Sequence, residues 1–172
     1  MSPLRHAGEL RRVMSGAIPT ATAAVFVIAG VAPSGATGFS PLTPFFTVAV
    51  IFFWVLTRPS LMPPAAVFAI GFLQDILSGG PVGLWALTLL IVEFFSLSER
   101  KLLFGQSYLV NWLGFASIVV IAVSSVWIGA CVFYGVLLSP VPVIVQGMLT
   151  VLVYPFVSWV LIRTLRWIPA EE

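Results

Sequence analysis

Six runs of apolar residues, separated by short breaks, constrain this chain more than any other feature. They cover residues 15–32, 42–57, 61–77, 81–97, 109–137 and 141–163. A helix needs about 20 residues to cross the roughly 30 Å hydrocarbon core of a bilayer. The runs predict an all-α polytopic membrane protein with six transmembrane helices. The second to fourth runs are short for a span, and the fifth is long enough to tilt.

The composition favours a membrane protein built as one unit. Of the 172 residues, 60% are hydrophobic and 8% are charged, and the mean hydropathy is +1.11. Such values are typical of chains that place most of their residues in lipid. No polar stretch is long enough to form a soluble domain, so we expect residues 1–172 to form a single integral membrane domain.

The basic residues all fall on one side of the six predicted helices. That side carries both termini and the loops at 58–60 and 98–108, whereas the loops at 33–41, 78–80 and 138–140 face the other side and contain no Lys or Arg. The eight basic residues are Arg5, Arg11, Arg12, Arg58, Arg100, Lys101, Arg163 and Arg166. Because cytoplasmic loops are enriched in Lys and Arg, we predict that both termini are cytoplasmic.

The reactive residues argue against catalysis. His6 is the only histidine and lies outside the predicted spans, Asp75 is the only aspartate, and Cys131 is the only cysteine. A serine–histidine site, a paired-aspartate site and a zinc site each need residues that the chain lacks. The sequence also contains no phosphate-binding glycine motif and no basic patch interleaved with aromatics. We therefore expect no enzymatic activity, no cofactor, no metal and no nucleic-acid partner.

Asp75 is one of two acidic residues inside the predicted spans, where an ionisable group is costly and is a candidate for function. It lies in the stretch IGFLQDILSGGPVGLW at 70–85. Gly71, Gln74, Asp75 and Ser78 recur at helical spacing, so one face of the third helix is small and polar. Such a face allows another backbone to approach and supplies hydrogen-bonding groups.

A tight turn follows this face, and Gly80 and Pro81 complete it, with Pro81 suited to the first position of the fourth helix. The first N–H groups of that helix lack intrahelical acceptors. A carboxylate that reaches across the turn could accept hydrogen bonds from them; we expect these donors to be Val82, Gly83 and Leu84. On this interpretation Asp75→Asn largely preserves the hairpin, whereas Asp75→Ala or Asp75→Leu weakens it. A proton or cation site and a direct partner contact are the alternatives.

Glu93 is the second acidic residue inside a predicted span. It lies about twelve residues, or ~18 Å, into the fourth helix and therefore in its cytoplasmic half. One explanation is that its carboxylate extends toward Arg58, Arg100 or Lys101. The other is a buried ion pair or a site that couples this protein to another.

Residues 52–94 contain an ordered set of short motifs within FFWVLTRPSLMPPAAVFAIGFLQDILSGGPVGLWALTLLIVEF. Phe53-Trp54 ends a helix before a proline-bearing loop, Gly71 to Asp75 form G-x-x-x-D, and Gly83-Leu84 follow a small-residue turn. Together these motifs resemble the MreD family of rod shape-determining proteins, over about a quarter of the chain. Two features depart from the family pattern. Residues 40–44 lack the Pro-Asp often found there, and Glu93 occupies a place that is usually apolar.

The resemblance implies a non-enzymatic scaffold in the bacterial inner membrane that helps maintain rod shape. Members of the family work in the cell-elongation machinery beside MreC, the RodA glycosyltransferase and its class B transpeptidase partner, and indirectly with the MreB filament. The family is also similar in architecture to the substrate-binding subunits of energy-coupling-factor vitamin transporters. As structural or interaction candidates we single out Gly71, Gln74, Asp75, Ser78, Gly80, Pro81, Gly83 and Glu93.

A second class of function, small-molecule transport, is compatible with the same helices. The chain would then be a substrate-binding membrane subunit of a vitamin-type transporter, and its small-residue first helix would dock a coupling protein. That interpretation needs a polar pocket that opens outward, for which the outer loops offer few groups. A scaffold should co-purify with MreC, whereas a transport subunit should co-purify with a vitamin-sized ligand.

Overall fold

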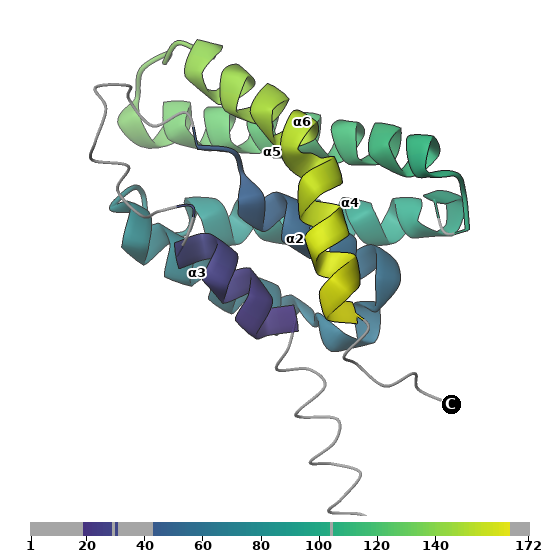
Figure 1. The fold of residues 1–172 in the computed structure, drawn as a ribbon. Coiled ribbons are helices and arrows are strands. Elements are labelled where there is room, and N and C mark those ends of the chain that lie inside the picture. Colours follow the sequence, from purple (N-terminus) through teal and green to yellow (C-terminus); the bar gives the residue numbers. More distant parts are fainter. Residues whose placement is uncertain (1–18, 29, 31–42, 104, 166–172) are drawn as a thin grey trace, which may run out of the picture.

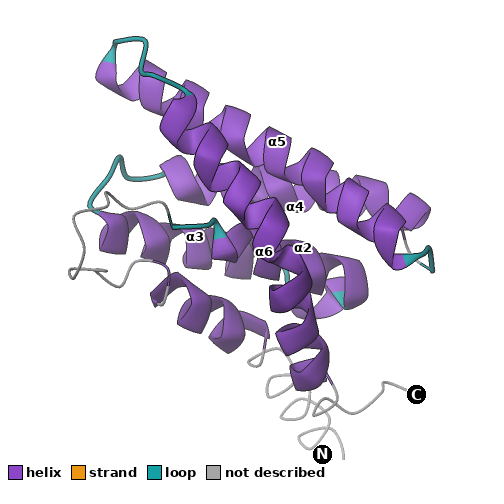
Figure 2. Cartoon of the chain, turned by 45° about the horizontal axis from the view of Figure 1, so that its top comes forward, coloured by secondary structure: helices purple, strands orange, loops and turns teal. Residues whose placement is uncertain are grey.

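The computed structural model describes residues 19–28, 30, 43–103 and 105–165, and within these ranges all regular structure is helical (Figure 2). A first helical segment, Pro19–Ile28, precedes the labelled helices. These are α2 (Phe46–Thr57), the short 3-10 helix η1 (Pro59–Leu61), α3 (Pro64–Ser78), α4 (Leu84–Leu103), α5 (Tyr108–Tyr134) and α6 (Val141–Leu165). The helical prediction is therefore confirmed for the described residues.

Helix α2 lies at the centre of the bundle (Figure 1). It packs against α4, α5 and α6, and every residue from Thr47 to Leu56 is buried. A helix that is apolar on all sides is buried either in a protein core or in lipid, and here other helices surround α2. Phe52, for example, lies against Phe115 of α5 and Tyr154 of α6, with ring centroids 5.2 and 5.9 Å away.

Both ends of α2 are held by side chains from helices later in the chain. The hydroxyl of Thr150 in α6 accepts a hydrogen bond of 2.7 Å from the Phe45 N–H. At the other end, Arg100 Nε in α4 donates to the Leu56 carbonyl over 3.1 Å. Helix ends carry N–H and C=O groups without intrahelical partners, and α2 has no side-chain cap of its own at its start. Distant residues therefore supply the caps that the local sequence lacks.

Helices α5 and α6 form an outer layer that exposes most of its apolar surface. Each is long and apolar enough to cross a membrane, with mean hydropathies of 2.3 and 1.8 over the most apolar stretch, yet only 28% of each stretch is buried. Val132 is 77% exposed and Leu152 is 68% exposed. Soluble monomers rarely expose continuous apolar surface of this kind. The two helices are thus compatible with a membrane protein, whereas six spans and their orientation remain predictions.

The other helices are shorter or carry more charge. Helices α2 and α3 have 12 and 15 residues, or about 18 and 22 Å. Helix α4 has 20 residues but includes Glu93, Glu99, Arg100 and Lys101. The predicted end of this helix at residue 97 is wrong, because the helix continues to Leu103. Its last turns consist largely of residues with good helix propensity, which extend the helix past the apolar run.

Helix α6 continues through Pro155 and bends part-way along its length (Figure 1), as a proline inside a helix predicts. A proline has no N–H, so the carbonyl four residues earlier loses its helical donor. That carbonyl belongs to Val151, and the indole N–H of Trp112 in α5 donates to it over 3.0 Å. The neighbouring helix therefore replaces the hydrogen bond that Pro155 removes.

Candidate functional site

The hairpin between α3 and α4 brings together most of the candidate residues found in the sequence. Helix α3 ends at Ser78, and Gly79 follows in the left-handed region with φ of 66°. Gly83 also has a positive φ, of 96°. Because a helix cannot pass through that conformation, α4 begins at Leu84. The prediction that Pro81 occupies the first position of α4 is therefore wrong; instead its carbonyl accepts a 3.2 Å hydrogen bond from the Leu84 N–H.

The Asp75 carboxylate binds three backbone N–H groups at the start of α4. Oδ2 accepts hydrogen bonds from Gly83 at 2.9 Å and from Ala86 at 3.3 Å, and Oδ1 accepts one from Trp85 at 2.8 Å. The predicted bridge across the turn is present. Gly83 is a donor as predicted, but the other two donors are Trp85 and Ala86, because the helix starts later than expected.

This bridge gives a buried carboxylate a favourable environment. Asp75 is 1% exposed, and three of its roughly four acceptor sites face N–H donors. Each hydrogen bond to a charged group contributes about 1.5–3 kcal/mol to the stability of the fold. The positive end of the α4 dipole adds to this and offsets the unfavourable end of α3, where Asp75 lies. The arrangement supports the bracing role over a proton or cation site.

Gly71 allows the first turn of α4 to lie directly on α3. A Cβ built on Gly71 would come within 2.5 Å of Ala86 Cα and 2.8 Å of Ala86 N. Ala86 is also one of the three donors to Asp75. The G-x-x-x-D pair therefore acts on one target: the glycine provides room for the turn, and the aspartate holds it there.

Gln74 and Ser78 lie on the same helix but do not bind the α4 start. The Ser78 hydroxyl donates to the Asp75 carbonyl over 3.2 Å and so stays within its own helix. Gln74 is 8% exposed, and its Oε1 accepts no hydrogen bond from the described residues. A buried acceptor without a donor costs about 1–3 kcal/mol. Both side chains line a cavity of about 230 Å³.

This cavity is bounded by the first helical segment, by α3 and α6, and by the starts of α2 and α4. Phe45 and Trp85 contribute aromatic walls, with ring centroids 5.1 Å apart at 70°. Gln74, Ser78 and Thr47 add polar groups. We name this space the amide cavity, after Gln74. One clue to the cavity is visible in the sequence, a glutamine on the small polar face of the third helix.

Glu93 and Gly80 lie apart from the site. Glu93 is 3% exposed on α4, and no hydrogen bond or ion pair links its carboxylate to a described residue. Extension of Glu93 toward Arg58, Arg100 or Lys101, one of the two explanations, is therefore not seen among the described residues, and a site that couples this protein to another stays a prediction. Arg100 lies about 10 Å farther along the same helix and donates to the Leu56 carbonyl. Gly80 is exposed in the turn and approaches no neighbouring helix.

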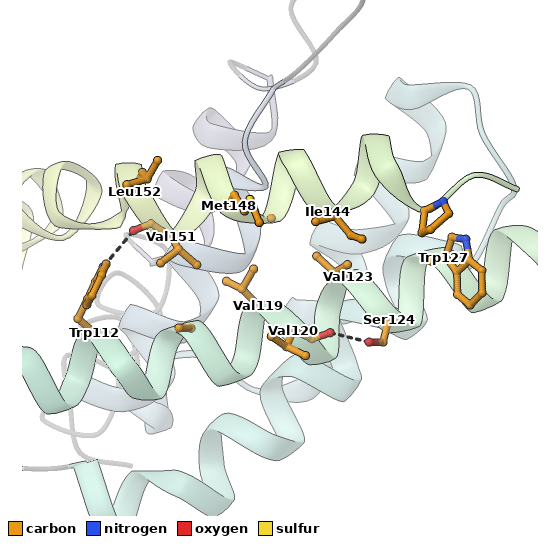
Figure 3. Close-up of a pocket in the computed structure, with 13 residues that line it drawn as sticks. Trp112, Val119, Val120, Val123, Ser124, Trp127, Ile144, Met148, Val151 and Leu152 are labelled. Carbon is orange, nitrogen blue, oxygen red and sulfur yellow. Dashed lines mark hydrogen bonds between the residues drawn. The ribbon is translucent and has the colours of Figure 1, made fainter.

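A second, larger space lies between α5 and α6 and is almost entirely apolar (Figure 3). It has a volume of about 680 Å³, and Trp112 and Trp127 stand at its opposite ends. The hydroxyl of Ser124 donates to the Val120 carbonyl within α5 over 2.8 Å. The groove therefore offers little to a polar ligand.

Among the described residues, no group of three His, Cys, Asp or Glu side chains is placed to hold a metal ion. The contacts of Trp112 and Thr150 are not predicted by the sequence pattern. For Trp112 a signal existed, since a proline at 155 predicts an unpaired carbonyl at 151.

A comparison of the chain with protein-family models, with curated proteins and with solved structures finds no match.

Proposed function

We propose that this chain is a non-enzymatic scaffold of the bacterial inner membrane, similar to the MreD family, which binds MreC and helps to position peptidoglycan synthases during cell elongation. One observation carries the proposal. Gly71, Asp75 and Gly83, which carry the resemblance in sequence, belong to one contact unit at the α3–α4 hairpin.

The distribution of apolar surface supports a role within the membrane. α2 is enclosed, whereas α3, α5 and α6 expose large apolar side chains, including Ile76 at 60%, Phe133 at 64% and Phe156 at 66%. Lipid or the spans of partner proteins can cover such surface without cost. The short turns between α3 and α4 and between α5 and α6 leave little chain to extend toward the cell wall. A protein of this shape acts by holding the spans of others.

The braced hairpin is the surface that we assign to a partner. Its exposed residues include Ile76, near the end of α3, and Val82 in the turn, at 60% and 70% exposure. Gly79 and Gly83 allow the positive φ angles of the turn, and the three Asp75 hydrogen bonds fix the conformation of this region. Pre-organised surfaces bind partners with a smaller loss of conformational entropy.

In-cell crosslinking tests this proposal. A photoreactive residue is placed at Ile76 or at Val82, and at Val120 on α5 as a control with similar exposure, 65%. The proposal predicts that crosslinks at the first two positions contain MreC and that purification in mild detergent recovers MreC. Depletion of the protein should convert rods into spheres. Recovery of no MreC from any position, with normal cell shape after depletion, would contradict the scaffold function.

The transport interpretation stays a second candidate because one observation favours it. It requires a polar pocket, and the amide cavity has polar groups on its wall. A vitamin-sized ligand that stays bound through purification would support it. Co-purification of MreC without such a ligand would argue for the scaffold.

A further inference from the structure

The amide cavity has a polar group that the fold itself does not satisfy. Gln74 is more than nine-tenths buried, lines the cavity, and keeps Oε1 without a hydrogen-bond donor from the described residues. Buried polar side chains in folded proteins nearly always have partners. The terminal torsion of a glutamine is soft, so this oxygen can turn toward the cavity. A donor inside the cavity would complete the site.

The walls of the cavity define the charge of a suitable occupant. None of its described lining residues is acidic or basic. Asp75 is a neighbour of Gln74, but both of its oxygens are directed at the N–H groups of Gly83, Trp85 and Ala86. A charged ligand would lose its hydration without gaining an opposite charge. The occupant should therefore be neutral.

The same walls define its shape. Phe45 and Trp85 stand edge to face at one side, and Phe26 and Phe46 form a second aromatic pair with centroids 6.1 Å apart. All four side chains line the cavity. Aromatic walls favour flat ring systems, which can stack on them or meet them edge to face. The volume of about 230 Å³ suits a single small ring system with its substituents.

We propose that the amide cavity is a binding site for a small, flat, uncharged molecule with an N–H donor, such as an aromatic amide or a neutral nitrogen heterocycle. The donor pairs with the Gln74 side-chain oxygen, and the ring packs against Phe45 and Trp85. The site adjoins the braced hairpin through Trp85, whose N–H binds Asp75. The proposal rests on the cavity alone and does not depend on the scaffold function.

Three probes of equal shape and different charge test the site. Benzamide is neutral, benzoate is an anion and benzamidine is a cation near neutral pH. Binding to the full-length protein in lipid nanodiscs is measured by titration calorimetry, with empty nanodiscs as the reference for partitioning into lipid. We expect saturable benzamide binding with a Kd below about 1 mM, and affinities at least about tenfold weaker for the two charged probes. No saturable binding of benzamide, or equal binding of all three, overturns the proposal.

Substitutions in the amide cavity test whether benzamide binds there. Gln74→Leu removes the amide at similar volume and should weaken benzamide binding by at least about tenfold. Gly30→Leu adds a side chain to the cavity wall, where the nearest atom to the new Cβ is Phe46 Cδ2 at 3.6 Å, and should abolish binding by occupying the space. Ser124→Ala, in the groove between α5 and α6, is the matched control and should bind as the unmodified protein does. Unchanged binding in both cavity variants overturns the assignment, and Gly30→Leu decides alone if Gln74→Leu fails to fold.

Discussion

Asp75 shows how a single side chain can hold the start of one helix against another. Its two oxygens bind different parts of the α4 start, Oδ1 at Trp85 and Oδ2 at Gly83 and Ala86. An asparagine can accept on one side only, and its NH₂ group would face an N–H on the other. The structure therefore revises the expectation that asparagine largely preserves the hairpin.

We predict a graded loss of stability at position 75. Asp75→Asn should lower the free energy of unfolding by about 1–2 kcal/mol, and Asp75→Leu by about 2–4 kcal/mol, because the leucine leaves all three N–H groups without an acceptor. Thermal unfolding of the purified proteins in detergent measures the stability of each variant and so tests the predicted order. Ser98→Ala serves as control, since the Ser98 hydroxyl bonds only to Phe94 of its own helix. Equal stability of the two Asp75 variants and the parent would refute the bracing role.

Gly71 gives a second prediction at the residue scale. In Gly71→Ala the new methyl group meets the backbone of Ala86, which cannot move without displacing the start of α4. We expect a loss of about 1–3 kcal/mol in unfolding free energy, measured by the same thermal assay. In Gly114→Ala the atoms nearest to the methyl group belong to the Leu103 side chain, with Cδ1 at 2.6 Å, and a side chain can adjust more easily than a backbone. A loss as large in Gly114→Ala would show that the close backbone approach is not the cause.

The sequence predicted part of this site for a physical reason. A G-x-x-x-D helix, a glycine-rich turn and a following helix start are close in sequence, so local geometry alone suggests that the carboxylate reaches free N–H groups. Two of the three donors were misassigned because the positive φ of Gly83 delays the start of α4. For Glu93 two explanations stay open at the level of sequence, because the partner of a buried carboxylate depends on where distant side chains lie, and sequence spacing does not contain that information.

At the scale of elements, α5 and α6 share one hydrogen bond that compensates for a proline. Trp112→Phe should remove the donor to the Val151 carbonyl and cost about 0.5–1.5 kcal/mol. Pro155→Ala should restore an N–H within α6 for the same carbonyl. In the Pro155→Ala background, the cost of Trp112→Phe should therefore shrink. A double-mutant cycle of unfolding free energies measures this coupling, and additive effects would contradict it.

Helix bounds followed from apolar runs in some places and not in others. The predicted and observed starts of α6 both lie at residue 141, just after a Ser-Pro pair, whereas α5 ends at Tyr134, before Gly135 with φ of 66°, and not at the predicted residue 137. The end of α4 was missed because Glu99, Arg100 and Lys101 leave the apolar pattern while still favouring a helix. Hydropathy detects where lipid or core ends, which is not always where a helix ends.

At the scale of the whole molecule, the orientation in the membrane is open to direct measurement. After Cys131→Ala removes the only native thiol, single cysteines are introduced at Ser60, Gly80 and Ser139, which are exposed residues between the long helices. We predict that a membrane-impermeant thiol reagent labels intact cells at Gly80→Cys and Ser139→Cys only. The basis is the one-sided distribution of Lys and Arg. Labelling of Ser60→Cys from outside would contradict the predicted topology.

The fold class could be predicted because apolar runs and breaks are local properties. The centre of the bundle could not. The sequence does not distinguish α2, whose residues 47–56 are all buried, from α5, which exposes Val120 and Val132, because both read as continuous apolar runs. Which apolar helix faces the interior depends on the contacts of all the others. The amide cavity, formed by residues from Phe26 to Gln146, depends on the same long-range arrangement.

The caps of α2 also set an order of events during biosynthesis. The helix emerges early from the ribosome, yet its two stabilising side chains, Arg100 and Thr150, are translated 43 or more residues after its last residue, Thr57. At about 18 Å the helix is too short to be secure in lipid by itself. In a nascent chain that stops before residue 150, the Phe45 N–H at the start of α2 lacks its acceptor, the Thr150 hydroxyl. Helix α2 therefore gains both of its caps only after Thr150 has been made.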